Sequence, residues 1–150
     1  MPVRSFALIA LIFLAGDLNG CRATYRDVSD ESPYREHIGQ ICEAVKPLNA
    51  MGYSFELGRN KKTDAITIWH ESFSGPEVTF KQSIPVGSRI IPLEARECTN
   101  CPFDLHPEYR VLVSPAPSQF EGKPAYLRAD SLTSGHLRCG GIDAQPKHSK

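Results

Sequence analysis

Twelve prolines are distributed along this 150-residue chain, and they limit how long any regular element can be. Proline lacks a backbone N–H and breaks helix interiors, so a proline-rich chain favours short strands and loops over long helices. From residue 52 onward, several segments alternate apolar and polar residues, which is the periodicity of a half-buried strand. Short strands with frequent turns are typical of a small barrel or sandwich. We expect strands at residues 53–57, 65–69, 78–80, 88–93, 109–113 and 123–127.

The segment before these strands has the periodicity of a helix. Ser32 is a suitable N-cap, Pro33 suits the first helical position, and apolar residues follow at positions 34, 38, 41, 42 and 45. These positions lie on one helical face, and Pro47 would end the helix. We therefore expect a mainly β domain with one N-terminal helix (α+β), in which Cys42 faces the interior.

Three stretches have the strand and turn order of a known small barrel. The stretches IPVGSRIIPLEA, YRVLVSP and KPAYLRADSL begin at residues 84, 109 and 123. They resemble bacterial SH3-like barrels in their spacing and in a glycine-led strand. The resemblance implies a small SH3-like barrel beside the N-terminal helix.

Residues 1–20 are interpreted as a secretory signal peptide rather than as part of the fold. Arg4 supplies a positive charge, an apolar run follows it, and small residues stand near a processing site. The apolar run is shorter than the ~20 residues of an ordinary membrane-spanning helix. Residues 21–31 are polar and are expected to form a tether, residues 32–144 a single globular domain, and residues 145–150 a flexible tail.

The sequence Leu18-Asn19-Gly20-Cys21 resembles the lipobox of bacterial lipoproteins. This resemblance implies that the Cys21 thiol receives a diacylglycerol group, that cleavage occurs before Cys21, and that the new amino group is acylated, for instance with palmitate. Two or more acyl chains hold a protein stably on a membrane. The family's inner-membrane retention signal usually has Asp at the next position, whereas this chain has Arg22. The resemblance therefore favours the periplasmic face of the outer membrane, with an ordinary secreted protein as the alternative.

Lipidation of Cys21 would leave four cysteines, and an even number fits full pairing in an oxidising periplasm. We favour a bridge between Cys42 and Cys139, near the two ends of the domain, and a second bridge within the CxxC motif of Cys98 and Cys101. The long bridge would stabilise the fold by ~4 kcal/mol in the chain-entropy model. Pairings that join Cys42 to a cysteine of the CxxC motif stay open.

The CxxC motif also allows a redox pair or a zinc site, but the surrounding sequence favours neither. A redox CxxC precedes a helix that lowers the thiol pKa, whereas Pro102 and Pro107 follow here. Structural zinc usually takes two closely spaced ligand pairs, and this chain has one. His70 and Glu71 resemble half of a metal motif, without a second histidine at helical spacing. We therefore expect no metal and no other cofactor.

Composition and motifs narrow the classes of function. Lysine plus arginine and aspartate plus glutamate both number 17, so the chain lacks the basic excess that nucleic-acid binding normally needs. The sequence contains no nucleophile elbow, no zinc-protease motif and no phosphate- or dinucleotide-binding loop. We therefore expect a protein that is not an enzyme and acts by binding.

Loop aromatics and one basic turn are the candidate binding residues. Phe73 and Phe103 lie in expected loops, where aromatic side chains often anchor partners. Arg59, Lys61 and Lys62 form a basic turn that suits an acidic partner or anionic headgroups. The favoured function is a lipid-anchored periplasmic inhibitor or immunity protein that neutralises a toxin or hydrolase. A structural accessory of an envelope or secretion machine and a peptidoglycan-binding module are the alternatives.

Overall fold

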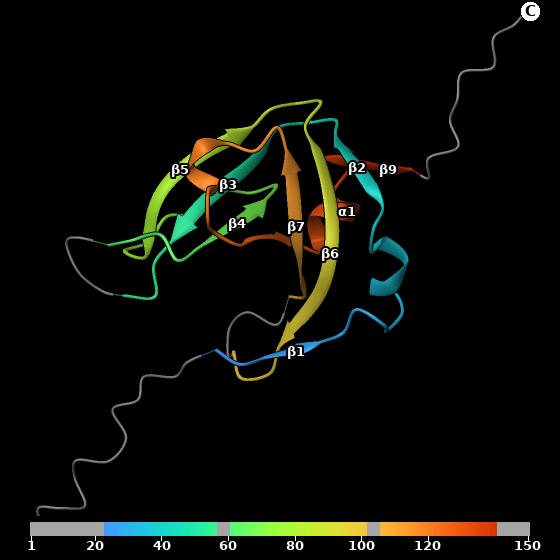
Figure 1. Ribbon diagram of the computed structural model, residues 1–150, viewed down its shortest axis with the longest axis horizontal. Helices are drawn as coiled ribbons and strands as arrows, with labels where there is room; N and C mark the ends of the chain where they lie inside the picture. The colour runs from blue at the N-terminus through green and yellow to red at the C-terminus, as the bar shows by residue number, and fades with distance from the viewer. Residues whose placement is uncertain (1–22, 57–60, 102–105, 141–150) are drawn as a thin grey trace, which may run out of the picture.

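The computed structural model describes residues 23–56, 61–101 and 106–140. In these residues nine strands form one mixed sheet, accompanied by a single short helix and two 3-10 turns (Figure 1). None of the helical segments in this part of the chain has the length and apolar character needed to cross a membrane. The turns are η1 (Tyr34–His37) and η2 (Ser118–Phe120), and the helix is α1 (Asp130–Thr133). The strands are β1 (Tyr25–Asp27), β2 (Ile41–Ala44), β3 (Leu48–Tyr53), β4 (Ala65–Trp69), β5 (Val78–Ile84), β6 (Arg89–Cys98), β7 (Glu108–Ser114), β8 (Ala125–Arg128) and β9 (Leu137–Gly140).

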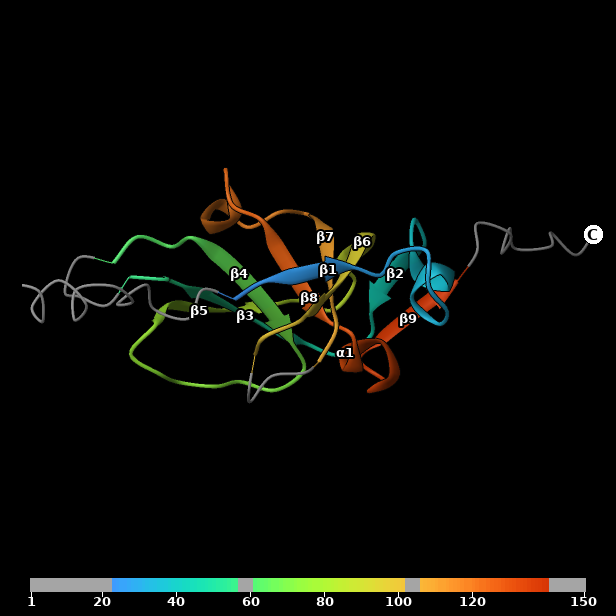
Figure 2. The same ribbon diagram turned by 90° about the horizontal axis from the view of Figure 1, so that it is seen from below.

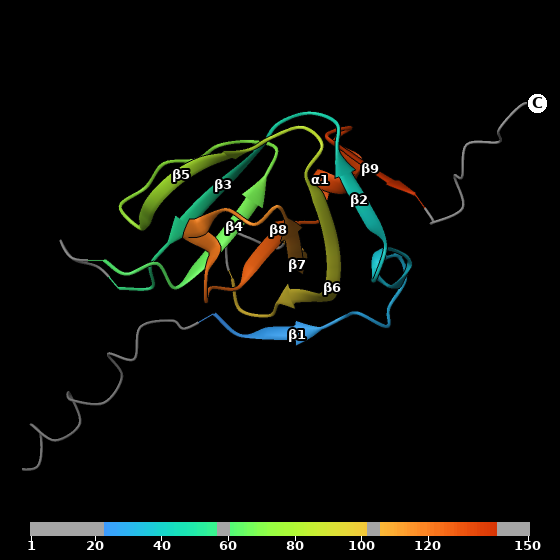
Figure 3. The same cartoon turned by 45° about the horizontal axis from the view of Figure 1, so that its top comes forward.

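The strand order across the sheet is β5-β3-β4-β8-β7-β6-β2-β9, and β1 pairs with β6 outside this path. β4 and β8 run parallel, and the other described pairs are antiparallel. β5 and β9 lie at opposite sides of the molecule (Figure 3). The sheet is therefore not closed, and the expected SH3-like barrel or sandwich is wrong. The three stretches that suggested a barrel overlap β6, β7 and β8, which form an antiparallel meander that many sheets share.

Side chains alternate between two faces of this sheet. Ala50 of β3 lies opposite Ile68 of β4, which lies beside Leu127 of β8, and all three are fully buried in the main core. The residues between them point to the other side of the sheet, since successive strand residues face opposite ways. We call the face that carries Thr67 and Tyr126, which pair across β4 and β8, the second face.

The expected N-terminal helix is wrong. The chain forms only the 3-10 turn η1, passes Gly39 in the left-handed region at φ 77°, and then enters β2. In β2, Cys42 and Ala44 are buried whereas Ile41 and Glu43 are exposed, which is strand periodicity. β2 pairs with β6 on one side and with β9 on the other. These two ladders outweigh a helical preference that Gly39 already weakens.

Within residues 21–31, which the sequence suggested to be a tether, β1 pairs with the end of β6. β1 lies across the bottom of the molecule in Figure 1 and toward the viewer in Figure 2. Val28, directly after β1, is 1% exposed and belongs to the main core. Arg26 forms exposed ion pairs with Glu31 at 2.5 Å and with Glu97 at 2.9 Å. The polar sequence of β1 shows no strand pattern, because an edge strand can be held by backbone pairing while its side chains stay in water.

The expected strand at residues 65–69 is confirmed as β4. The strands expected near β5, β6, β7 and β8 overlap those elements with shifted ends. The strand expected at residues 53–57 is wrong in its position, because β3 ends at Tyr53. β9 and α1 had no counterpart among the expected elements. β9 has few apolar residues and is held to β2 by pairing and by a disulfide.

Candidate functional site

The most organised cluster on the second face is an arginine between two tyrosine rings. The guanidinium carbon of Arg96 on β6 lies 3.9 Å from the ring centre of Tyr25 on β1 and 3.5 Å from that of Tyr126 on β8. Arg96 Nε donates a hydrogen bond to Glu108 Oε1 on β7 at 2.7 Å, and Arg96 Nη2 lies 2.5 Å from the same oxygen. The side chains of Arg96 and Glu108 are only 17% and 15% exposed. This cluster, which we call the arginine cluster, therefore joins four strands.

The electrostatics of the arginine cluster keep its ion pair charged. Burial alone would lower the pKa of Arg96, but the charge and hydrogen bond of Glu108, with smaller contributions from Tyr126 and Tyr25, together raise the pKa overall. Burial also raises the pKa of the nearby Tyr53 phenol above its usual range, and the negative charge of Glu108 adds to that rise. The cluster is therefore a largely buried ion pair whose guanidinium lies against the rings of Tyr25 and Tyr126. Its chemistry suits a rigid joint or a contact surface.

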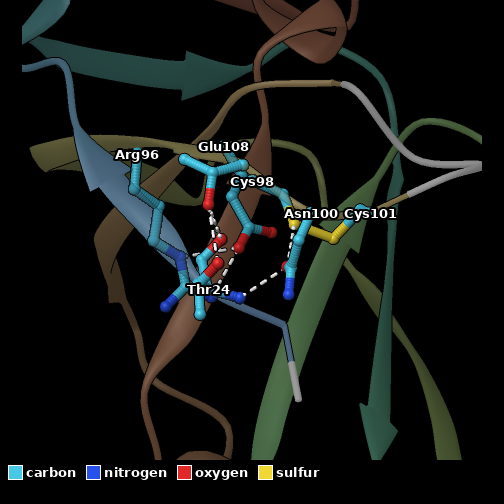
Figure 4. Close-up of a disulfide and its surroundings, with 7 residues drawn as sticks. Thr24, Arg96, Cys98, Asn100, Cys101 and Glu108 are labelled. Atoms are coloured by element: carbon cyan, nitrogen blue, oxygen red, sulfur yellow. Dashed lines mark hydrogen bonds and ion pairs between the residues drawn. A yellow bond between two sulfur atoms is a disulfide. The ribbon is translucent and has the colours of Figure 1, made fainter. Parts of the chain in front are cut away.

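Beside the arginine cluster, a disulfide-closed turn between Cys98 and Cys101 holds the start of β1 (Figure 4). Asn100 Oδ1 accepts a hydrogen bond from the backbone N–H of Thr24 at 2.8 Å. The backbone N–H of Thr99 donates to the Thr24 carbonyl at 2.9 Å, and the hydroxyl oxygens of these two threonines lie 2.6 Å apart. The turn therefore fixes the backbone immediately before β1.

A small depression lies at the same place, lined by Tyr25, Cys98, Cys101, His106 and Glu108. Its volume of about 20 Å³ holds a water molecule and is too small for an organic ligand. Among the described residues, no group of three or more His, Cys, Asp or Glu side chains is placed to hold a metal ion.

A second stacked cation lies on the same face, next to α1. The guanidinium carbon of Arg128 is 4.5 Å from the ring centre of Trp69. Trp69 Nε1 donates a hydrogen bond to Asp130 Oδ2 at 3.1 Å. The ring of His70 lies 5.4 Å from that of His136, measured between ring centres. These contacts attach the end of β4 to the segment around α1.

Ser131, His70 and Asp130 are the residue types of a nucleophilic triad, but their arrangement differs from one. In a triad, the serine and the carboxylate contact opposite nitrogens of the histidine ring. Here Ser131 Oγ at 3.3 Å and Asp130 Oδ1 at 4.0 Å both face His70 Nδ1. Ser131 is also 0% exposed, so its hydroxyl is closed to a substrate. The three side chains act as a polar link between β4 and α1.

The two disulfides follow the pairing that we favoured from sequence. Cys42 and Cys139 are bonded with 4.0 Å between their Cα atoms, because they lie directly opposite each other on β2 and β9. Cys98 and Cys101 are bonded with 5.7 Å between their Cα atoms. The first bridge ties the C-terminal strand into the sheet, and the second shapes the turn that holds β1.

The predicted binding residues lie away from the arginine cluster or outside the described residues. Phe73 is half-buried, and its backbone N–H lies 3.4 Å from Met51 Sδ, so it packs over β3. Lys61 is half-buried and Lys62 is exposed, and both lie between β3 and β4. The predicted candidates outside the described residues are Arg59 and Phe103.

Sequence reasoning missed Tyr25, Arg96 and Tyr126, which come from three strands far apart in the chain. One signal could have found the charged part of the cluster. β6 carries Glu94 and Arg96, and the residues opposite them on β7 are Arg110 and Glu108, with reversed charges. Alternating opposite charges on two successive strands indicate cross-strand ion pairs on one face.

Comparison with known proteins gives no further guide to the site. No protein-family model, no characterised protein and no solved structure matches this chain. We therefore infer the function from the arginine cluster, the contacts around α1 and the two disulfides.

Proposed function

We propose that this chain is a lipid-anchored periplasmic protein that acts by binding another protein and has no enzymatic activity. The observation that carries the proposal is the pairing of Cys42 with Cys139 and of Cys98 with Cys101. Disulfides persist in oxidising compartments such as the periplasm and are rare in the cytosol. Of the five cysteines in the sequence, Cys21 is then left for another use, and it stands in the lipobox-like motif.

The favoured partner is a toxin or hydrolase that this protein inhibits. Two disulfides and the arginine cluster support a rigid surface, and a rigid surface loses little conformational entropy when it binds. Beyond the cluster, the second face carries an ion pair between Arg110 and Glu94 at 3.1 Å. Leu112 stands next to this pair and is 56% exposed. This mixture of apolar and charged groups suits a protein partner.

The anchor is tested by Cys21→Ser, compared with Ala23→Ser, which leaves the lipobox-like motif intact. Membrane and soluble fractions are separated from cells that express each variant and the parent. We expect the parent and Ala23→Ser in the membrane fraction and Cys21→Ser in the soluble fraction. A membrane-bound Cys21→Ser protein would contradict the lipid anchor.

The binding role is tested by crosslinking in cells, with Leu112→Arg as the comparison. We expect one periplasmic toxin or hydrolase to be captured by the parent and lost with Leu112→Arg. The purified parent should inhibit the activity of that captured protein. Capture without inhibition would favour the accessory role, and pelleting with cell-wall sacculi would favour peptidoglycan binding.

A further inference from the structure

The distance between the proposed acylation site and the folded domain is short. Thr24 is held by Thr99 and Asn100 through hydrogen bonds of 2.6 to 2.9 Å. Only three residue steps separate Cys21 from Thr24. Even a fully extended chain spans at most about 11 Å over three steps. An acyl group on Cys21 would therefore hold this end of the domain close to the bilayer surface.

The same end of the domain carries two exposed aromatic side chains. Phe55 is 71% exposed, the highest value among the large exposed apolar residues of the described part, and Tyr25 is 42% exposed. The start of β1, the end of β3 and the start of β4 lie toward the same side of the molecule in all three views (Figures 1, 2 and 3). The Phe55 ring packs edge-on against Tyr53, with 5.3 Å between ring centres.

The position of Phe55 is held by the local backbone. Its N–H donates a hydrogen bond to Asp64 Oδ2 at 2.7 Å, and Ser54 Oγ lies 3.3 Å from the same carboxylate oxygen. The backbone of Phe55 is therefore tied to Asp64 just after β3 ends, and its side chain is exposed. A large apolar ring held in water in this way loses its unfavourable hydration when it enters the bilayer interface.

We propose that this end of the domain lies on the bilayer and that Phe55 inserts into the membrane interface. The inference rests on the proposed lipid anchor at Cys21. The occupant of this surface is the lipid bilayer itself, because the chain between Cys21 and Thr24 leaves too little length for another protein to separate the two.

Charge plays a smaller part than apolar contact at this surface. The connection between β3 and β4 carries three basic residues, Arg59, Lys61 and Lys62, and two acidic residues, Glu56 and Asp64, so its net charge is only +1. Charges of both signs at similar number give little net attraction to anionic headgroups. Insertion of Phe55 should therefore depend only weakly on salt and on the fraction of anionic lipid.

This orientation also places the rest of the sheet away from the membrane. β6 runs from Arg89 to Cys98, where it pairs with β1, and ten residues of strand span about 33 Å. Val86 precedes the far end of β6 and is 58% exposed. The far end of the sheet would thus face the periplasm and be free for a partner.

The test uses full-length lipoprotein purified from membranes, with its acylation measured by intact mass. The protein is reconstituted in phosphatidylcholine vesicles whose acyl chains carry bromine, which quenches tryptophan on contact. Phe55→Trp adds an emitter at the proposed contact, and Val86→Trp is the matched exposed control. Trp69 is the only tryptophan of the parent, so its emission can be subtracted.

We expect the added emission of Phe55→Trp to be quenched and shifted to shorter wavelength, in low and in high salt. The added emission of Val86→Trp should have the same intensity in brominated vesicles as in vesicles without bromine. Acylated protein with unquenched Phe55→Trp, or with both variants equally quenched, would overturn the orientation and leave the anchor standing. A mature mass without acyl chains would overturn the anchor and the orientation together.

Discussion

Removal of the Arg96 side chain, in the variant Arg96→Met, should cost much more stability than removal of the neighbouring Arg110. Arg96 is 17% exposed, pairs with Glu108 at 2.5 Å, and stacks on two tyrosine rings. A hydrogen bond to a charged group contributes about 1.5–3 kcal/mol. Each cation–π contact adds about 0.5–1 kcal/mol, and loss of Arg96 also leaves Glu108 largely buried without this partner. We expect Arg96→Met to lower the free energy of unfolding by about 3 kcal/mol, within the range for broken buried pairs.

Arg110→Met is the matched control, because Arg110 pairs with Glu94 across the same two strands at 3.1 Å. These side chains are 49% and 40% exposed, and exposed pairs contribute only about 0.2–1 kcal/mol. Both variants are unfolded in urea with the disulfides intact, and a double-mutant cycle with Glu108→Gln isolates the pair. Equal losses for Arg96→Met and Arg110→Met would show that the Arg96 ion pair contributes no more than an exposed one. So would a coupling between Arg96 and Glu108 close to zero.

Three further outcomes follow from the fold. Replacing both Cys42 and Cys139 by alanine should lower the free energy of unfolding by ~3–5 kcal/mol, because their bridge closes a loop across 97 residues. Thermal unfolding of the variant and the parent measures this loss. An unchanged melting temperature would count against this bridge. Burial raises the pKa of Tyr109 from 10.0 to about 12, so the unfolded chain loses this proton first as pH rises. Stability should therefore be unaffected by Tyr109 below pH 10 and fall between pH 10 and about 12, and Tyr109→Phe should reduce that fall in alkaline urea titrations. Gly39→Ala should destabilise by about 1–2 kcal/mol in urea unfolding, because Gly39 has φ 77° with no atom within 4 Å of an added Cβ, so only backbone strain acts. A neutral Gly39→Ala would show that the left-handed turn is not needed.

Local patterns predicted the β character of this chain better than its architecture. The alternation at residues 65–69 is the whole of β4, because that strand is bounded on both sides by polar residues. The apolar spacing from Tyr34 to Val45 fits a helix equally well, and only pairing with β6 and β9 makes residues 41–44 a strand. That pairing brings Cys42 against Cys139, 97 residues away, which no local window contains.

The candidate site was harder to predict for the same reason. Tyr25 lies in a polar segment, and its pairing with Cys98 could not be inferred from its neighbours in the chain. Arg96 meets Tyr25 and Tyr126 only after β1, β7 and β8 have been arranged around β6. Exposed Phe55 was assigned to a strand, whereas the fold ends β3 at Tyr53 and presents Phe55 in the following turn.

The most direct test of the central claim is the intact mass of the mature protein from native membranes, measured without reduction after alkylation. We expect a chain that begins at Cys21, carries acyl groups at that residue, and takes up no alkylating agent because its other four cysteines are paired. A chain that keeps residues before Cys21, or that carries an alkylated Cys21 without lipid, would contradict the lipid anchor.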